Sequence, residues 1–155
     1  CVFLAGWQML KFLCVVVMAV LCLVGSSSGS LPSDGRAVVK AVNKIRVAHG
    51  LSRLRLEPRL QRAARNQSAL MARVGKMTHK VGHGYGFGAR LRSVGYKGLA
   101  AENIARGPFS FNRILKGWMS SPGHRRNMLN PRMRYFGLSV VKGGGHKYWA
   151  MVLGG

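Results

Sequence analysis

The sequence predicts a layered α+β domain. Two stretches in the first half of the chain repeat their apolar residues at helical spacing, whereas residues 136–140 and 148–153 have the character of two strands joined by a glycine-rich loop. Of the 155 residues, 48% are hydrophobic, which is enough for one ordinary core. Helices that precede a pair of strands favour an arrangement in which the helices pack in layers on a sheet.

The first helix is predicted over residues 34–48. Its apolar residues recur every three or four positions and form one buried stripe: Val38, Ala41, Val42, Ile45 and Ala48. His49 and Gly50 follow this stripe, and glycine is common directly after the last turn of a helix. The helix is therefore expected to end at these two residues.

The second helix is predicted over residues 58–74. Pro58 suits the first turn of a helix, where its missing N–H costs nothing. The inner face consists of apolar residues at helical spacing: Leu60, Ala63, Ala64, Met71 and Val74. Gly75 is expected to end the helix.

The middle of the chain is harder to assign. A glycine-rich passage at residues 81–88 precedes a short helix predicted at 89–94. Residues 101–106 place a polar pair among apolar neighbours, which indicates a strand or an extended segment. Ser110 is a suitable N-cap for the next helix. The buried stripe of that helix is apolar: Phe111, Ile114, Leu115 and Trp118.

The last third of the chain is predicted to form a hairpin. Residues 136–140 alternate apolar and small side chains, as in a strand. Residues 142–147 contain three glycines and are expected to form the loop, and residues 148–153 are expected to form the returning strand.

His124 lies at a predicted corner of the chain. The preceding helix is expected to end at Trp118, and Pro122 and Gly123 then interrupt the backbone. A new helical turn is expected to start close to His124. An imidazole at such a corner points into the cleft that the flanking elements enclose.

The amino-terminal segment is predicted to be a separate unit. An apolar run at residues 12–24 follows Lys11 and precedes small residues, which is the pattern of a secretory signal peptide. The run is shorter than the roughly 18 to 20 residues that span a bilayer, so a membrane anchor formed by residues 1–24 is the alternative. The predicted organisation is a signal peptide, a linker and one domain, at residues 1–26, 27–33 and 34–155.

Cysteine usage agrees with this division. All three cysteines, Cys1, Cys14 and Cys22, precede the predicted domain, which therefore has no disulfide or thiol chemistry. Lipid attachment at Cys22 is disfavoured because Leu21 stands where lipoprotein signals have a small residue.

The chain is strongly basic. It has 25 Lys and Arg against 3 Asp and Glu, which gives a formal net charge of +22. The positive electrostatic field of such a protein attracts nucleic acid, lipid head groups and acidic polysaccharide alike. The basic residues are spread along the chain, which favours a solvated basic surface. No recognised nucleic-acid motif is present, so no specific nucleic-acid binding is expected.

Three side chains are candidates for a reactive site: His79, Glu102 and His124. Two imidazoles and a carboxylate are sufficient ligands for a catalytic zinc ion, and the same groups can act without metal as base, acid and orienting carboxylate. Their spacing does not show that they converge, so isolated core or surface histidines are the alternative. Ser120 and Ser121 lack a neighbouring carboxylate and a strand–serine–helix elbow, which disfavours serine catalysis.

Six short blocks occur in a fixed order along the domain: MTH (77–79), RLRSVGY (90–96), AENIA (101–105), GWMSSPGHRRNMLNP (117–131), FGLSV (136–140) and YW (148–149). This order resembles the CAP superfamily of cysteine-rich secretory proteins, antigen 5 and pathogenesis-related class 1 proteins. It is most similar to the short bacterial members that lack disulfides. The block at residues 117–131 is highly specific for this family. The resemblance covers residues 37–153.

The resemblance implies a three-layer α-β-α sandwich with a cleft. In the family this cleft has two histidines and two acids and can bind a divalent metal such as zinc. His79 and His124 match the histidines, and Glu102 matches the first acid. Tyr135 replaces the second acid, which lowers the negative charge and should weaken zinc binding. His83, in the glycine-rich passage, is an alternative ligand.

The resemblance further implies an exported, monomeric SCP-domain protein, secreted or periplasmic, that binds a lipid or an envelope component. The basic surface would favour anionic lipid or envelope polymer, and membrane contact through that surface or an uncleaved amino terminus. The alternative is a zinc-assisted hydrolase, in which His79 and His124 hold the metal and Glu102 acts as ligand or base. A structural or adhesive role is a third class.

Overall fold

The computed structural model describes residues 35–81 and 86–155. The predicted signal peptide, its anchor alternative, the linker and His83 lie outside these ranges. No helix in the described ranges is both long enough and apolar enough to cross a bilayer. The elements in chain order are α2 (Gly35–Ala48), β1 (Arg55–Leu56), α3 (Pro58–Val74), α4 (Phe87–Ser93), β2 (Ala100–Gly107), α5 (Phe111–Ser120), α6 (Pro122–Met128), β3 (Tyr135–Gly143) and β4 (His146–Gly154).

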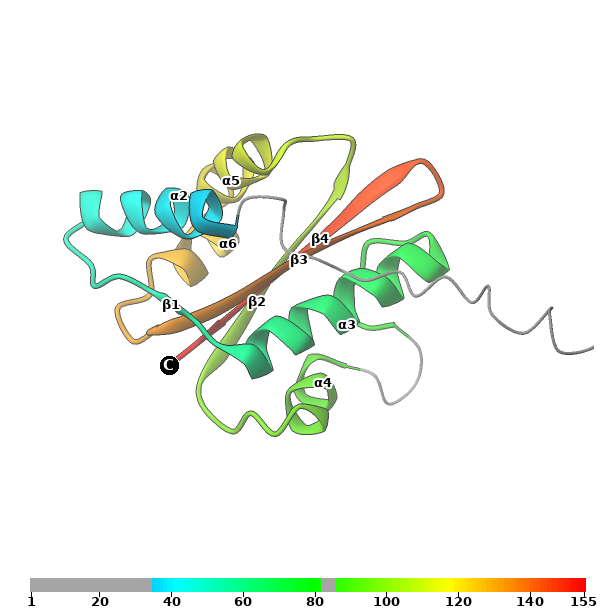
Figure 1. Cartoon of the computed structure of the whole chain (residues 1–155), viewed down its shortest axis with the longest axis horizontal. Coiled ribbons are helices and arrows are strands. Elements are labelled where there is room, and N and C mark those ends of the chain that lie inside the picture. Colours follow the sequence, from blue (N-terminus) through cyan, green and yellow to red (C-terminus); the bar gives the residue numbers. More distant parts are fainter. Residues whose placement is uncertain (1–34, 82–85) are drawn as a thin grey trace, which may run out of the picture.

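These elements form a three-layer α-β-α sandwich (Figure 1). Across the described residues the middle layer is a 4-stranded sheet with the strand order β1-β3-β4-β2. Helices α2, α5 and α6 cover one face, and α3 and α4 cover the other. The predicted α+β class and the sandwich implied by the resemblance are both confirmed.

The β3–β4 hairpin forms the centre of the sheet. Gly144 and Gly145 make its turn, with φ of 53° and 76°, a region that side chains other than glycine rarely adopt. β4 pairs antiparallel with β2 on its other side, and β1 adds a short parallel pair to β3. Among the described strands β2 therefore lies at one edge of the sheet.

Alternation along the strands gives the sheet two apolar faces. One face packs against α2, α5 and α6 and includes Phe136, Leu138, Trp149, Met151 and Leu153. The other packs against α3 and α4 and includes Ile104, Tyr148, Ala150 and Val152. Trp118 and Trp149 are both buried, as predicted from their apolar surroundings.

The ends of α3 follow from local side-chain chemistry. The Glu57 carboxylate accepts a hydrogen bond from the backbone N–H of Leu60 at 2.8 Å, which caps the helix just before Pro58. Gly75 ends it with φ of 67°. The predicted bounds of this helix are confirmed.

Several local features differ from the prediction. The helix α5 ends at Ser120 rather than Trp118, the hairpin loop consists of residues 144–145 rather than 142–147, and Val74 is 49% exposed rather than on the inner face of α3. The short helix begins at Phe87, two residues earlier than expected. Pro122 is the first residue of α6 rather than a break before it, because proline is well tolerated at that position of a helix. The two-residue strand β1 was not predicted, since only its pairing with β3 defines it.

Arg46 connects segments that are distant in the sequence. Its side chain is 0% exposed and donates hydrogen bonds to four backbone carbonyls: Ser52 at 2.9 Å, Met128 at 2.7 Å, Asn130 at 3.1 Å and Met133 at 3.3 Å. Carbonyl oxygens, rather than a carboxylate, therefore satisfy this buried charge. The contact joins the end of α2 to the end of α6 and the entry into β3.

We predict that Arg46→Met lowers the free energy of unfolding by about 3 kcal/mol, because several buried carbonyls lose their donor. Urea unfolding followed by circular dichroism measures this change. Lys44→Met, at an exposed position of the same helix, is the control and should change stability by about 0.5 kcal/mol or less. Equal midpoints for the two variants would contradict the structural role of Arg46.

Candidate functional site

Glu102 is the centre of a buried charged cluster. It lies on β2 and faces the α3–α4 layer, and its side chain is 2% exposed. Nη2 of Arg90 donates to both carboxylate oxygens, at 2.8 and 2.6 Å. His79 places Nδ1 2.8 Å from Oε1 of the same carboxylate. A buried carboxylate is thus held by a permanent cation and an imidazole.

The helix α4 positions Arg90 for this contact. Arg90 is 3% exposed, and its Nη1 also donates to the backbone carbonyl of His79 at 3.1 Å. One arginine therefore holds both the carboxylate and the backbone of the segment that carries His79. The His79 side chain stays 53% exposed, so its ring remains accessible from solvent.

His124 approaches the same edge strand from the other layer. Asn103 follows Glu102 on β2 and points to the opposite face, because successive strand residues alternate. Its Nδ2 donates to the backbone carbonyl of His124 at 3.1 Å, and its Oδ1 accepts from Asn127 at 2.9 Å. The His124 ring centroid lies 6.5 Å from that of Trp118.

The surroundings of His124 favour its neutral form. Burial lowers its pKa below the usual value, and the nearby His79 lowers the pKa further. The structure brings His79 and Glu102 into direct contact. It holds the backbone of His124 against Asn103, on the opposite face of β2 from Glu102.

Tyr135 lies elsewhere in the sheet. It pairs with Gly154 at the start of β3, whereas Glu102 pairs with Val152 on the far side of β4. Two strand spacings of about 4.8 Å separate their backbones, so the distance is roughly 10 Å or more. Tyr135 lines a different hollow, together with Glu57, Arg59, Gly95, Tyr96, Lys97, Gly98 and Gly155.

The arrangement does not fit a zinc ion. Catalytic zinc normally has three protein ligands, but both oxygens of Glu102 already accept hydrogen bonds from Arg90. Within residues 35–81 and 86–155, no three His, Cys, Asp or Glu side chains gather as a possible metal site. We therefore derive no chemistry through zinc at this cluster.

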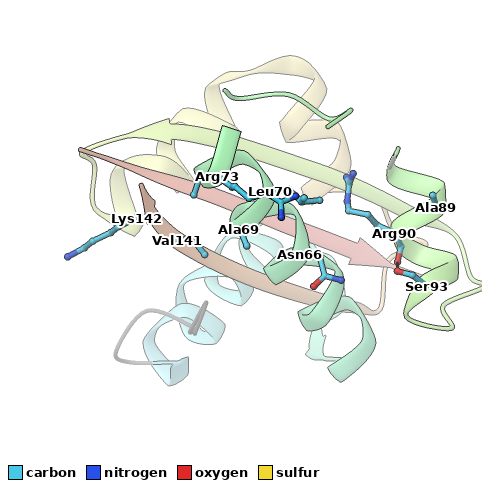
Figure 2. Close-up of a pocket in the computed structure, with 10 residues that line it drawn as sticks. Asn66, Ala69, Leu70, Arg73, Ala89, Arg90, Ser93, Val141 and Lys142 are labelled. Carbon is cyan, nitrogen blue, oxygen red and sulfur yellow. Dashed lines mark hydrogen bonds between the residues drawn. The ribbon is translucent and has the colours of Figure 1, made fainter. Parts of the chain in front are cut away.

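A hollow of about 910 Å³ adjoins the cluster through Arg90 (Figure 2). Arg73, Val141 and Lys142 lie at one side of it, and Ala89, Arg90 and Ser93 lie at the other. Among the described residues, the lining combines three cationic side chains with apolar ones and includes no carboxylate: Asn66, Ala69, Leu70, Ala72, Arg73, Ala89, Arg90, Ser93, Val141 and Lys142. Its size is in the range of small-molecule binding sites.

Arg90 and Asn103 were not among the predicted site residues. Both lie inside short blocks that support the family resemblance, but nothing in the local sequence distinguishes Arg90 from the exposed Arg92. One feature of the sequence, the scarcity of carboxylates, could have identified Arg90 as a site residue. A domain with so few carboxylates must neutralise any that it buries, and an arginine in the same blocks is the simplest partner.

Comparison with known proteins gives a family match. The profile of the cysteine-rich secretory protein family, CAP, matches residues 39–153. The protein YkwD of Bacillus subtilis (strain 168) is 34% identical over 122 residues, which cover 77% of this chain and 47% of that protein. The chain therefore spans about half the length of this curated relative.

Solved structures share the fold. An extracellular protein containing an SCP domain from Bacillus anthracis (strain Ames) is 27% identical with a TM-score of 0.67, over 82% of this chain and 45% of that chain. An outer surface protein of Borrelia burgdorferi is 18% identical with a TM-score of 0.70, over 77% of this chain and 90% of that chain. The second likeness concerns the fold alone.

We predict that Arg90→Ala lowers the free energy of unfolding by about 3–5 kcal/mol, because it leaves the buried carboxylate of Glu102 without its cation. Arg92→Ala, at an exposed position of the same helix, should change it by about 0.5 kcal/mol or less. The double variant Arg90→Met, Glu102→Leu should recover part of the loss, since no buried charge is then unpaired. Urea unfolding would refute the prediction if Arg90→Ala and Arg92→Ala were equally stable.

We predict that acidification destabilises the fold partly through His124. Because the pKa of His124 is lower in the folded protein than in the unfolded chain, its contribution is fully present above the unfolded pKa and is lost as pH falls through the folded pKa. Thermal unfolding at pH 7.5 and pH 5 should show a smaller acid-induced loss for His124→Gln than for wild type. An unchanged acid-induced loss in His124→Gln would rule the effect out.

Proposed function

The chain belongs to the cysteine-rich secretory protein (CAP) family, and from that premise we propose that it is an exported ligand-binding protein whose ligand is an anionic lipid or envelope component. The observation that carries the proposal is the hollow beside the charged cluster. It offers cations and apolar surface together, and no carboxylate from the part of the chain that the structure describes lines it. An anion with an apolar body satisfies both parts of such a surface.

Cations lie at both sides of the hollow, and the one on α4, Arg90, is bound to Glu102. Arg73 and Lys142 come from α3 and β3 and supply positive charge at one side (Figure 2). Leu70 and Val141 supply apolar surface, and Ser93 supplies a hydroxyl at the other side. The acidic group of an amphiphile would lie beside Arg73 and Lys142, and its apolar body would cover the side chains of α3 and β3.

Arg90 connects this hollow with the histidine cluster. It lines the hollow and also holds the Glu102 carboxylate and the backbone of His79. A ligand in the hollow would therefore contact a residue on which the position of His79 depends. In this proposal the contacts of the cluster serve to shape a binding site.

Export is part of the proposal. The pattern of residues 1–26 supports a signal peptide. Among the compared structures, the Bacillus anthracis protein is described as extracellular and the Borrelia burgdorferi protein as an outer surface protein. A protein outside the cytoplasm would meet lipid head groups and envelope polymers, which are the anions that its basic surface favours.

A second function, metal-free hydrolysis, is favoured by one contact. His79 is oriented by Glu102 through Nδ1 and has an accessible ring, which is the arrangement of a general base. Arg90 weakens this reading, because it neutralises the carboxylate that would otherwise stabilise the imidazolium formed when His79 takes a proton. Binding is therefore the function that the geometry supports better.

We predict that the full chain binds dansylated undecanoic acid, a fluorescent carboxylate with an apolar chain, more tightly than its neutral methyl ester. Arg73→Gln combined with Lys142→Gln should weaken binding about tenfold, or about 1.4 kcal/mol. Ala69→Trp should abolish it by filling the hollow. Fluorescence titration gives the dissociation constants.

The matched control is Arg36→Gln combined with Lys40→Gln on α2, which removes the same charge from the opposite layer at exposed positions. It should bind like wild type. Equal weakening by both pairs, or full binding by Ala69→Trp, would show that the hollow is not the binding site.

A further inference from the structure

One end of the molecule, which we call the hairpin end, is formed by the β3–β4 turn, the last turn of α3 with the residues after it, and the segment after β2. The turn packs directly on the helix: a Cβ atom added to Gly143 would lie only 2.8 Å from the backbone oxygen of Ala72. Lys147 pairs with Gly107 at the end of β2, and its Nζ lies 3.5 Å from the backbone oxygen of Phe109. These contacts bring the three segments together.

The hairpin end exposes large apolar side chains. Val74 and Met77 are each 49% exposed at and just after the end of α3, and Phe109 is 38% exposed beside the hairpin. Exposed apolar side chains gathered on one end of a protein commonly mark a contact surface. Phe109 also has the guanidinium of Arg113 5.2 Å from its ring centroid, so apolar and cationic groups are interleaved here.

The charge of this end is entirely positive in the described residues. Its cations come from all three segments: Arg73, Lys76, Arg106, Arg113, Lys142 and Lys147. The described carboxylates are elsewhere. Glu57 caps the opposite end of α3, a helix of 17 residues and therefore about 25 Å long, and is paired with Arg59 at 2.7 Å. Glu102 is buried against Arg90.

We propose that the hairpin end docks on the surface of an anionic lipid bilayer. Cations attract the protein to acidic head groups, and half-exposed apolar side chains between them gain by entering the interface. A soluble polyanion would use the cations alone and would gain nothing from Val74 or Met77. The inference rests on the proposed function and extends it, because Arg73 and Lys142 belong both to this end and to the ligand hollow, which would then open beside the bilayer.

The test measures which end of the protein meets the bilayer. Full-length chains with Trp7→Phe and either Phe109→Trp or Tyr135→Trp are mixed with vesicles of brominated phosphatidylglycerol, which quench a tryptophan that they contact. Phe109 and Tyr135 are equally exposed at 38%, but β3 separates Tyr135 from the hairpin turn by about 27 Å. We expect at least twofold stronger quenching at position 109, and loss of this difference with neutral phosphatidylcholine vesicles.

A matched pair of variants tests the apolar contact. In the Phe109→Trp chain, Val74→Ser with Met77→Ser should reduce quenching at least threefold, whereas Val47→Ser with Leu56→Ser should not. The control residues are 48% and 42% exposed, and so resemble Val74 and Met77 in size and exposure. Circular dichroism establishes that both variants are folded.

Equal quenching at positions 109 and 135 would overturn the proposal, and so would equal effects of the two serine pairs. Either result would mean that a polycationic protein is attracted to the acidic bilayer without a preferred orientation. Binding of dansylated undecanoic acid in solution is measured on the same chains. If that binding persists while oriented docking fails, the docking inference alone is wrong; if both fail, the proposed function fails as well.

Discussion

The buried contact between Arg90 and Glu102 is the interaction on which the candidate site depends. A carboxylate with a 2% exposed side chain cannot remain charged in an apolar layer without a partner, and Arg90 reaches both of its oxygens. The same arginine binds the backbone of His79 and lines the neighbouring hollow. One side chain on a seven-residue helix thus holds the backbone of a histidine, pairs a buried acid and forms part of the wall of a cavity.

The edge strand β2 explains how residues from two layers meet. Glu102 faces the α3–α4 layer, and Asn103, the next residue, faces α6 and holds the backbone of His124. Because β2 has β4 as its neighbour on one side and lies at the sheet edge in the described residues, side chains from both layers approach around it. The two histidines are therefore held from opposite faces of the sheet by consecutive residues of one strand.

Charge balance connects the site with the surface. Both carboxylates in the described residues are bound by arginines, Glu57 by Arg59 and Glu102 by Arg90. Apart from the buried Arg46, most of the other basic side chains lie at the surface, and residues 35–81 and 86–155 contain no further acid, so the positive charge of this part of the chain acts outward. Attraction to anions is then a property of the whole surface, and selectivity must come from places where apolar groups accompany the cations, such as the hollow and the hairpin end.

The sequence by itself determined the elements whose signals are local. Helical spacing located α2, α3 and α5, strand alternation and glycines located the hairpin, and the blocks around Glu102 and His124 indicated the family fold. Only the tertiary structure decided which groups meet: that Arg90 binds both oxygens of Glu102, that Tyr135 lies two strands from that carboxylate, that Arg46 binds distant carbonyls, and that β1 is a strand. The physical reason is that periodicity records which face of an element is buried, whereas the partner of a buried polar group depends on packing between elements far apart in the chain, on which local pattern carries no information.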